Sequence, residues 1–193
     1  MPISIIRQDI TTLTCDAIVN AANKSLLGGG GVDGAIHRAA GPLLYKECKT
    51  LNGCESGQSK ITSAYNLPSK FIIHTVGPQD GNPSVLESCY NTCLELVLEN
   101  NIKSIAFPCI ATGIYGYPNQ EGAELAYRIA LDFCEQHPDV DIIFCVFLKI
   151  DQDIYKELHG DDVEEEIEEE LDSSKGEEDD VLEEDDHEFA DDE

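Results

Sequence analysis

Residues 20–34 read Asn20-Ala-Ala-Asn-Lys-Ser-Leu-Leu-Gly-Gly-Gly-Gly-Val-Asp-Gly34 and include four consecutive glycines. The apolar pattern predicts a strand at Ala17–Asn20 and a helix that ends at Gly41-Pro42, so the glycines link a strand to a helix. Backbone N–H groups that lack side chains around them can approach an anion, and the positive end of the following helix favours negative charge. Glycine runs also occur in plain flexible loops, so residues 28–31 alone predict only a candidate anion site.

A second turn of this kind reads Ala111-Thr-Gly-Ile-Tyr-Gly-Tyr-Pro118 and also follows an expected strand. The glycine run matches neither the dinucleotide fingerprint nor the triphosphate-binding loop. Two loops at the carboxyl ends of strands in one sheet would nevertheless line the crevice where open α/β folds bind ligands. The alternative is two unrelated strand-to-helix turns. Polar and aromatic side chains near the turns favour a diphosphate site instead: Asn20, Asn23, Asp33 and Tyr115.

Short β-rich runs alternate with helical patterns along most of the chain, which is typical of an α/β domain built from crossover units. The predicted strands are Ile3–Ile6, Ala17–Asn20, Phe71–Thr75, Ser104–Phe107 and Ile142–Phe147. The last three are nearly continuous in apolar character, as expected of strands that helices cover on both faces. A layered sandwich follows from this pattern.

Three further helices are predicted between and after these strands. Ser84-Val-Leu-Glu87, which follows Pro83, predicts a capping box at the start of one helix. Apolar residues recur at helical spacing after Asn119, and Pro138 closes that helix. A shorter final helix is predicted at Asp151–Leu158.

Charge divides the chain at Gly160. Residues 1–160 hold 18 acidic and 11 basic side chains, whereas residues 161–193 hold 21 acidic side chains and one basic side chain. Self-repulsion at the second charge density predicts an extended, disordered segment. We therefore expect one folded domain over residues 1–160 and an acidic disordered tail over residues 161–193.

Several classes of protein are disfavoured by the composition. The sequence has no cluster of Lys and Arg, so direct binding to nucleic acid is not expected. No apolar run is long enough to span a bilayer, and the N-terminus lacks the pattern of a secretory signal. The eight cysteines are scattered without a zinc-ribbon pair, which favours reduced, buried thiols and no metal site. We expect an intracellular monomer, in the cytoplasm, the nucleus or both, that needs no cofactor.

Five segments, in order along the domain, resemble those of the macrodomain family and specifically its MacroD-type branch. They are Asp9-Ile-Thr11, Asn20–Gly34, Ala35-Ile-His-Arg-Ala-Ala-Gly41, His74-Thr-Val-Gly-Pro78 and Thr112-Gly-Ile-Tyr-Gly116. The resemblance implies a three-layer α/β/α macrodomain fold with a mixed, mostly parallel central sheet. It also implies that the ligand is ADP-ribose.

The same resemblance implies where the adenine and the diphosphate bind. Asp9 and Ile10 would bind the adenine amino group and Phe147 would pack on the ring, although an Asp after a strand commonly serves as a turn or helix cap. The diphosphate would lie between two backbone segments: Gly29, Gly30, Gly31 and Val32 in one, and Ala111, Thr112, Gly113, Ile114, Tyr115 and Gly116 in the other. The family commonly has Ser where this chain has Ala111, so any contribution of that hydroxyl is lost.

Around the distal ribose, the resemblance implies two catalytic residues, Asn23 on the sugar hydroxyls and Asp33 beside the anomeric carbon. Asn20 would be a further contact, and Tyr115 would cover the sugar. A carboxylate can orient or deprotonate a water molecule, but either Asp33 or the substrate diphosphate could take the proton. Asp33 could instead be the N-cap of its helix. His37, one helical turn further on, could orient Asp33 or be purely structural.

The implied activity is hydrolysis of the ester between mono-ADP-ribose and an Asp or Glu side chain of a protein, together with deacetylation of O-acetyl-ADP-ribose. The alternative is a module that binds ADP-ribosylated proteins without turnover, but a pure reader has less need for a carboxylate at the scissile bond. A third hypothesis assigns a function to the acidic tail, which would bind basic partners such as histones. A solubilising tail is the commoner role of such a segment.

Overall fold

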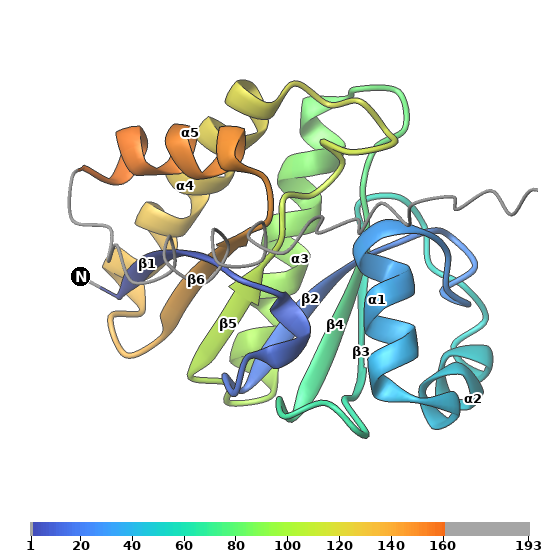
Figure 1. Cartoon of the computed structure of the whole chain (residues 1–193). Helices are drawn as coiled ribbons and strands as arrows, with labels where there is room; N and C mark the ends of the chain where they lie inside the picture. The colour runs from blue at the N-terminus through green and yellow to red at the C-terminus, as the bar shows by residue number, and fades with distance from the viewer. Residues whose placement is uncertain (1, 161–193) are drawn as a thin grey trace, which may run out of the picture. The chain divides into compact units, whose positions relative to one another are not determined.

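The structure, a computed structural model, describes residues 2–160, and the expected acidic tail at 161–193 lies outside the described residues. The described part contains a six-stranded sheet with the strand order β1-β6-β5-β2-β4-β3 (Figure 1). The strands are β1 (Ile3–Arg7), β2 (Ala17–Ala22), β3 (Ser59–Ser63), β4 (Phe71–Val76), β5 (Ser104–Phe107) and β6 (Asp141–Val146). All five predicted strands are therefore present, with β3 in addition.

Four of the strand pairs are parallel and one is antiparallel. β1 pairs with β6, β6 with β5, β5 with β2 and β2 with β4, all in parallel, whereas β3 runs antiparallel to β4 at the edge. This arrangement confirms the mixed, mostly parallel sheet. Because parallel neighbours point the same way, the carboxyl ends of five strands lie at one edge of the sheet, and the loops that follow them share that edge.

Helices cover the sheet on both faces (Figure 1). The elements are η1 (Ile10–Thr12), α1 (Gly31–Ala40), α2 (Pro42–Thr50), α3 (Pro83–Glu99), α4 (Asn119–Gln136) and α5 (Lys149–His159). One apolar core lies between the sheet and α3, α4 and α5, and a second lies between the sheet and α1 and α2. Successive strand residues alternate between the two cores, as Ile105, Ala106 and Phe107 do, because side chains alternate across a strand. The three-layer α/β/α fold is thus confirmed.

Helix starts differ from the sequence predictions. The N-cap of α1 is Gly30, so Asp33 lies inside the first turn and is not the N-cap. The N-cap of α3 is Asn82, whose Oδ1 accepts a hydrogen bond from the Ser84 N–H at 3.0 Å, so the capping box predicted at Ser84 is wrong. Proline is favoured at the first helical position because its missing N–H needs no partner there, and Pro83 therefore moves the cap to Asn82.

The described residues contain no helix that is long and apolar enough to cross a membrane. All eight cysteines are free thiols, six of them buried and two partly buried. Burial of these thiols agrees with their position in apolar runs of the sequence.

Phe144 on β6 provides a test of the larger core. It is 1% exposed, and its ring lies 4.7 Å from that of Tyr155 and 6.1 Å from that of Phe107, between centroids. We expect Phe144→Ala to lower the free energy of unfolding by about 3–5 kcal/mol in urea titrations, because it leaves a cavity. Leu131→Ala on the exposed side of α4 is the control, with a change within about 0.5 kcal/mol. A similar loss in both variants would contradict this assignment of the core.

Candidate functional site at the carboxyl edge of the sheet

Two of the loops at the carboxyl edge follow neighbouring strands. The first spans residues 23–30 between β2 and α1, and the second spans residues 108–118 between β5 and α4. β2 and β5 are paired in parallel, so both loops leave the sheet at the same edge. The structure therefore places the glycine run and the second turn at the carboxyl edge of one sheet, as the sequence predicts, and shows in addition that their strands are adjacent.

Asp33 carries the only carboxylate in the first turn of α1 and points toward the sheet. It is 4% exposed, and its Oδ1 accepts a hydrogen bond from Asn20 Nδ2 on β2 at 2.8 Å. His37 Nε2, one helical turn further on, lies 3.4 Å from the same oxygen. Burial raises the pKa of Asp33, and the hydrogen bond from Asn20 and the proximity of His37 partly oppose that rise. A carboxylate with a raised pKa is a better proton acceptor.

Asn23 shapes the first loop. Its Nδ2 donates to the Gly28 carbonyl at 3.0 Å, and its Oδ1 accepts from the Ser25 N–H at 3.1 Å. A Cβ atom on Gly29 would lie 3.3 Å from Asn23 Nδ2 and 3.2 Å from Asp33 Oδ2. The backbone of Gly29 therefore lies between the two side chains that the sequence predicts to be catalytic.

The amino end of α1 offers backbone donors. The first N–H groups of any α-helix have no partner within the helix, and Gly30, as the N-cap, supplies no side-chain hydrogen bond to them. Glycine is required at position 34 because a Cβ atom there would lie only 2.5 Å from the Gly29 carbonyl oxygen. The loop thus packs directly on the helix and presents its N–H groups at the carboxyl edge.

The second loop contains a tight turn. Gly116 N–H donates to the Gly113 carbonyl at 3.0 Å and Tyr117 N–H to the Ala111 carbonyl at 2.9 Å. Ala111 adopts a left-handed φ of 64°, and a Cβ atom on Gly77 would lie 3.0 Å from the Ala111 Cβ. The turn therefore rests against the backbone that follows β4, where a side chain on Gly77 would be crowded. Ile114 is 91% exposed at the tip of the turn, and Tyr115 is partly buried.

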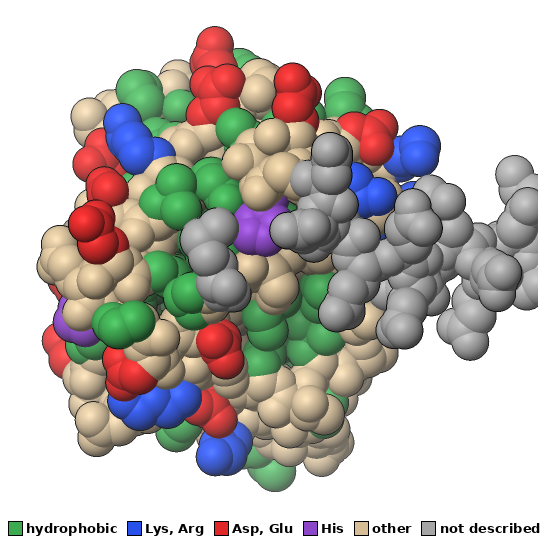
Figure 2. All heavy atoms as spheres, turned by 90° about the vertical axis from the view of Figure 1, so that its left-hand side faces the viewer, with side chains coloured by type: hydrophobic (Ala, Val, Ile, Leu, Met, Phe, Trp, Pro, Cys, Tyr) green, Lys and Arg blue, Asp and Glu red, His purple; other side chains and the backbone are tan. Residues whose placement is uncertain are grey.

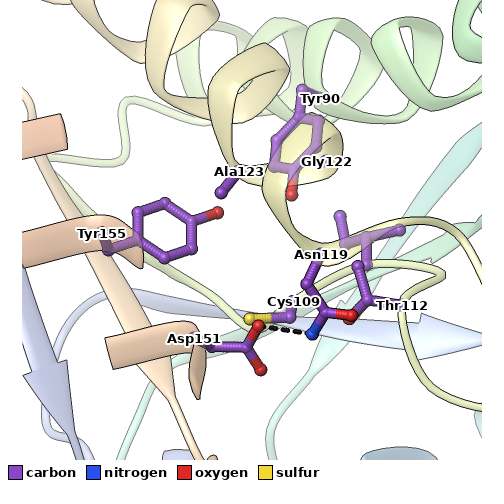
Figure 3. Close-up of a pocket in the computed structure, with 9 residues that line it drawn as sticks. Tyr90, Cys109, Thr112, Asn119, Gly122, Ala123, Asp151 and Tyr155 are labelled. Carbon is purple, nitrogen blue, oxygen red and sulfur yellow. Dashed lines mark hydrogen bonds between the residues drawn. The ribbon is translucent and has the colours of Figure 1, made fainter. Parts of the chain in front are cut away.

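A small pocket, too tight to hold a water molecule, lies behind this turn (Figure 3). Asn119 at the start of α4 donates through Nδ2 to Asp151 Oδ1 of α5 at 2.7 Å, and Thr112 of the turn lines the same pocket. Tyr90 and Tyr155 close its other side. Asp151 is buried, and burial and the nearby Asp151 carboxylate raise the pKa of the Cys109 thiol. The pocket fixes the base of the second loop and admits no ligand.

Asp9, Ile10 and Phe147 lie together at the far side of the same edge. Arg7 Nε donates to the Phe147 carbonyl at 3.0 Å, which ties the end of β1 to the end of β6. Asp9 is the N-cap of η1, and its Oδ1 accepts from the Thr11 N–H at 3.0 Å. Phe147 lies one residue beyond β6 and is 78% exposed, whereas Ile10 is buried. β5 lies between β6, which leads to Phe147, and β2, which carries Asn20.

Two buried residues in contact with this site were not identified as site residues by sequence reasoning. His74 on β4 lies 3.1 Å through Nδ1 from Asn20 Nδ2, and Thr62 on β3 lies 2.9 Å through Oγ1 from His74 Nε2. A histidine inside the otherwise apolar run Phe71–Val76 was a visible signal. The partner on β3 was not visible, because the sequence analysis did not predict that strand.

Lys and Arg side chains do not dominate the visible surface. On the face shown in Figure 2, they occur singly or in small groups among acidic side chains of the described residues. This face offers no continuous basic surface for a nucleic acid backbone.

Comparisons with known proteins agree with this geometry. The profile of the Macro domain family matches residues 19–126, which include both loops. The chain is 58% identical over 163 residues to the ADP-ribose glycohydrolase MACROD1 of Bos taurus, and 56% identical over 162 residues to MACROD2 of Homo sapiens. Each match covers 80% of this chain, which spans only 50% and 38% of those relatives. A macro domain-containing protein of Chlorobaculum tepidum is 51% identical and is covered over 93% of its length.

Solved structures resemble the fold closely. The Trypanosoma brucei macrodomain in complex with ADP-ribose superposes with a TM-score of 0.80 at 45% identity, over 82% of this chain and 69% of that chain. The Oceanobacillus iheyensis macrodomain with ADP has a TM-score of 0.76 at 45% identity, over 79% and 87% of the two chains.

The pKa of His74 makes stability depend on pH. Burial, and to a smaller extent the nearby His37, lowers the pKa of His74 to about 3, well below its ordinary value of 6.5. Between these values the unfolded chain binds a proton that the folded protein excludes, so stability falls as the pH falls, by up to about 1.4 kcal/mol per pH unit. His74→Asn should lack this contribution. Urea titrations at about pH 6 and about pH 4.5 measure it. Asp33 contributes with the opposite sign in both proteins, so equal pH dependence would contradict the prediction.

Proposed function

Since this chain belongs to the macro domain family, we propose that it binds ADP-ribose and hydrolyses the ester that joins ADP-ribose to Asp or Glu side chains of proteins. It also removes the acetyl group from O-acetyl-ADP-ribose, because both substrates present an ester on the distal ribose of one ligand. The main observation in support of this proposal is the buried Asp33 carboxylate, with its raised pKa, beside Asn23 and the glycine loop. Relatives named ADP-ribose glycohydrolase, at 56–58% identity, support this activity.

The order of the strands supports the placement of the ligand. Asp9 and Phe147 at β1 and β6 receive the adenine, the loops after β5 and β2 hold the diphosphate, and Asn23 and Asp33 meet the distal ribose. β1 and β2 are three strand spacings apart, or about 14 Å along the edge. The Oδ1 of Asp9 already caps η1, so its other carboxylate oxygen is the one that meets the adenine amino group.

The reaction consumes one water molecule, breaks one ester bond and releases ADP-ribose and a free carboxylic acid. Asp33 orients or deprotonates the water, while the amide of Asn23 binds the ribose hydroxyls and Tyr115 covers the sugar. Backbone N–H groups of Gly29 to Val32 and of Ala111 to Gly116 neutralise the diphosphate. Since Ala111 has no hydroxyl, only the backbone of that position takes part. No cofactor is needed for this chemistry.

Mono-ADP-ribosylated proteins are the proposed partners, and free ADP-ribose and O-acetyl-ADP-ribose are the small ligands. An intracellular monomer fits these partners, because the modified side chain must reach the exposed carboxyl edge of a single domain. A reader module without turnover is the second candidate. The protonatable carboxylate at the ribose position favours the enzyme over the reader.

Replacement of the carboxylate separates the two candidates. Asp33→Ala should still bind ADP-ribose, because the backbone donors remain, but should lose about 100-fold or more in the rate of ADP-ribose release from a glutamate-modified protein. Calorimetry with ADP-ribose and a release assay on ester-linked and arginine-linked substrates measure the two effects. Full activity of Asp33→Ala would refute the catalytic assignment. Binding by the wild-type protein without any release would support the reader.

Two glycines test the position of the diphosphate. A Cβ atom on Gly30 or Gly113 would meet no protein atom within 4 Å, and neither residue has a left-handed φ. Gly30→Ala and Gly113→Ala should therefore fold with a nearly unchanged melting temperature. If the diphosphate occupies that open space, each methyl group should weaken ADP-ribose binding by about 1–3 kcal/mol, which is about 5- to 150-fold. Wild-type affinity in both variants would place the diphosphate elsewhere.

A further inference from the structure

A chain of hydrogen bonds leads from β3 across the sheet to Asp33. Asn20 on β2 and His74 on β4 are directly opposite in the parallel register, and Thr62 on β3 pairs with Ile72, two residues before His74. Alternation along the strands turns these three side chains toward the α1 and α2 layer. Asn20, His74 and Thr62 are 0%, 0% and 2% exposed, so water does not compete for their hydrogen bonds.

The donors and acceptors in this series of hydrogen bonds can be assigned in one consistent direction. Thr62 Oγ1 donates its hydrogen to the Ser63 carbonyl at 3.0 Å, so toward His74 it acts as an acceptor. His74 Nε2, 2.9 Å away, therefore carries the imidazole proton. Cys48 Sγ, the other neighbour of Nε2, lies 4.0 Å away, which makes it a much weaker hydrogen-bond partner than Thr62. His74 Nδ1 is left unprotonated and accepts from Asn20 Nδ2 at 3.1 Å.

The amide of Asn20 is oriented by this acceptor. One hydrogen of Nδ2 goes to His74 Nδ1 and the other to Asp33 Oδ1, at 3.1 Å and 2.8 Å. The Oδ1 of Asn20 is buried and has no hydrogen-bond partner among the described residues. Rotation of the amide would turn this oxygen toward the lone pair of His74 Nδ1 and toward the carboxylate, which is repulsive on both sides.

We propose that Thr62 and His74 are positioning residues of the hydrolytic site, which act on Asp33 through the amide of Asn20. Neither residue touches the substrate. Thr62 selects the tautomer of His74, His74 selects the orientation of the Asn20 amide, and the amide presents an N–H to the carboxylate. The catalytic consequence rests on the proposed function, whereas the effect on Asp33 itself is measurable in the ligand-free protein.

Loss of the Thr62 acceptor should reverse the donor and acceptor roles along this series of hydrogen bonds. His74 then moves its proton to Nδ1, the Asn20 amide rotates, and Asp33 faces an oxygen in place of an N–H donor. The ionised form of Asp33 is destabilised, so its pKa rises further. The other titratable groups that face Asp33 are His37 on α1, Cys48 on α2 and His74 on β4, and the sequence change leaves all three in place.

Thr62→Val, which keeps the shape but removes the hydroxyl, tests the proposal, with Thr62→Ser as the conservative variant. We expect Thr62→Val to lower kcat for ADP-ribose release by about 10-fold or more, because Asp33 loses the N–H donor that orients its carboxylate. The Kd for ADP-ribose should stay within about threefold, because the backbone donors that bind the ligand are unchanged. The acidic limb of the kcat profile should move to higher pH. Thr62→Ser should restore both. Ile73→Val, a buried change on the opposite face of β4, is the control for a general loss of packing.

A pair of His74 variants keeps the proposal testable if Thr62→Val folds poorly. Asn carries its amide oxygen near the position of Nδ1, so His74→Asn can still accept from Asn20. Gln carries its amide near the position of Nε2, so His74→Gln cannot. His74→Asn should retain much more activity than His74→Gln at a similar melting temperature. Equal kcat in the two variants would overturn the proposal.

Titration of the Asp33 side-chain carboxyl by carbon-13 NMR, in the protein without ligand, gives a readout independent of turnover. The midpoint should move to higher pH in Thr62→Val and in His74→Gln and stay near the wild-type value in Thr62→Ser and Ile73→Val. An unchanged midpoint in Thr62→Val overturns the inference, whatever the activity. If the midpoint moves in Thr62→Val but the wild-type protein does not hydrolyse the substrate, the proposed function is rejected. The series of hydrogen bonds from Thr62 to Asp33 would then still be established.

Discussion

The hydrogen bond from Asn20 Nδ2 to Asp33 Oδ1 joins the centre of the sheet to the first turn of α1. An ionised carboxylate is costly to bury unless it is hydrogen-bonded, and this bond together with the positive helix end makes the burial of Asp33 tolerable. The position of Asp33 in turn requires Gly29, whose hydrogen lies where a side chain would meet the carboxylate. The glycine loop, the helix start and the site are consequently one structure, in which this hydrogen bond adds a polar link to the apolar packing of α1 on the sheet.

Each of the two loops contains one of the five non-glycine residues that have a left-handed φ among the described residues. Leu26 and Ala111, both without the freedom of glycine, adopt left-handed φ values of 62° and 64°. Such a conformation costs roughly 1–2 kcal/mol per residue. Leu26 is completely buried in the core beneath α1, and Ala111 is held against Gly77, so packing offsets the strain in both cases. Strained residues of this kind persist only where the surroundings fix them, so the packing around Leu26 and Ala111 is what holds each residue in this conformation.

The sequence predicted the parts of the fold that depend on local patterns. Buried parallel strands have continuous apolar runs, which located both ends of β4, β5 and β6 within one residue. β3, with the sequence Ser59-Lys-Ile-Thr-Ser63, is an edge strand with little apolar character, and only its pairing with β4 makes it a strand. The site residues divide in the same way, into those that a local motif reveals and those that depend on strand pairing. Asn20, Asp33 and the glycines were evident from the motif. The contact of Thr62 with His74 depends on the antiparallel register of β3, a strand that the sequence pattern does not predict.

The negative net charge of the protein has to be reconciled with a site for an anionic ligand. The sequence carries a net charge of -27, yet its proposed ligand is an anion. Backbone N–H groups at the start of α1 act over a short range, whereas charges more than about 8 Å away are largely screened at physiological salt. In the proposed complex, the N–H groups that bind the diphosphate would also stabilise the ionised form of Asp33. A diphosphate bound there would place a second negative charge near the carboxylate, and like charges disfavour ionisation. In the proposed complex, ligand binding would therefore raise the proton affinity of Asp33, and the hydrogen bond from Asn20 would hold the carboxylate in place against that repulsion.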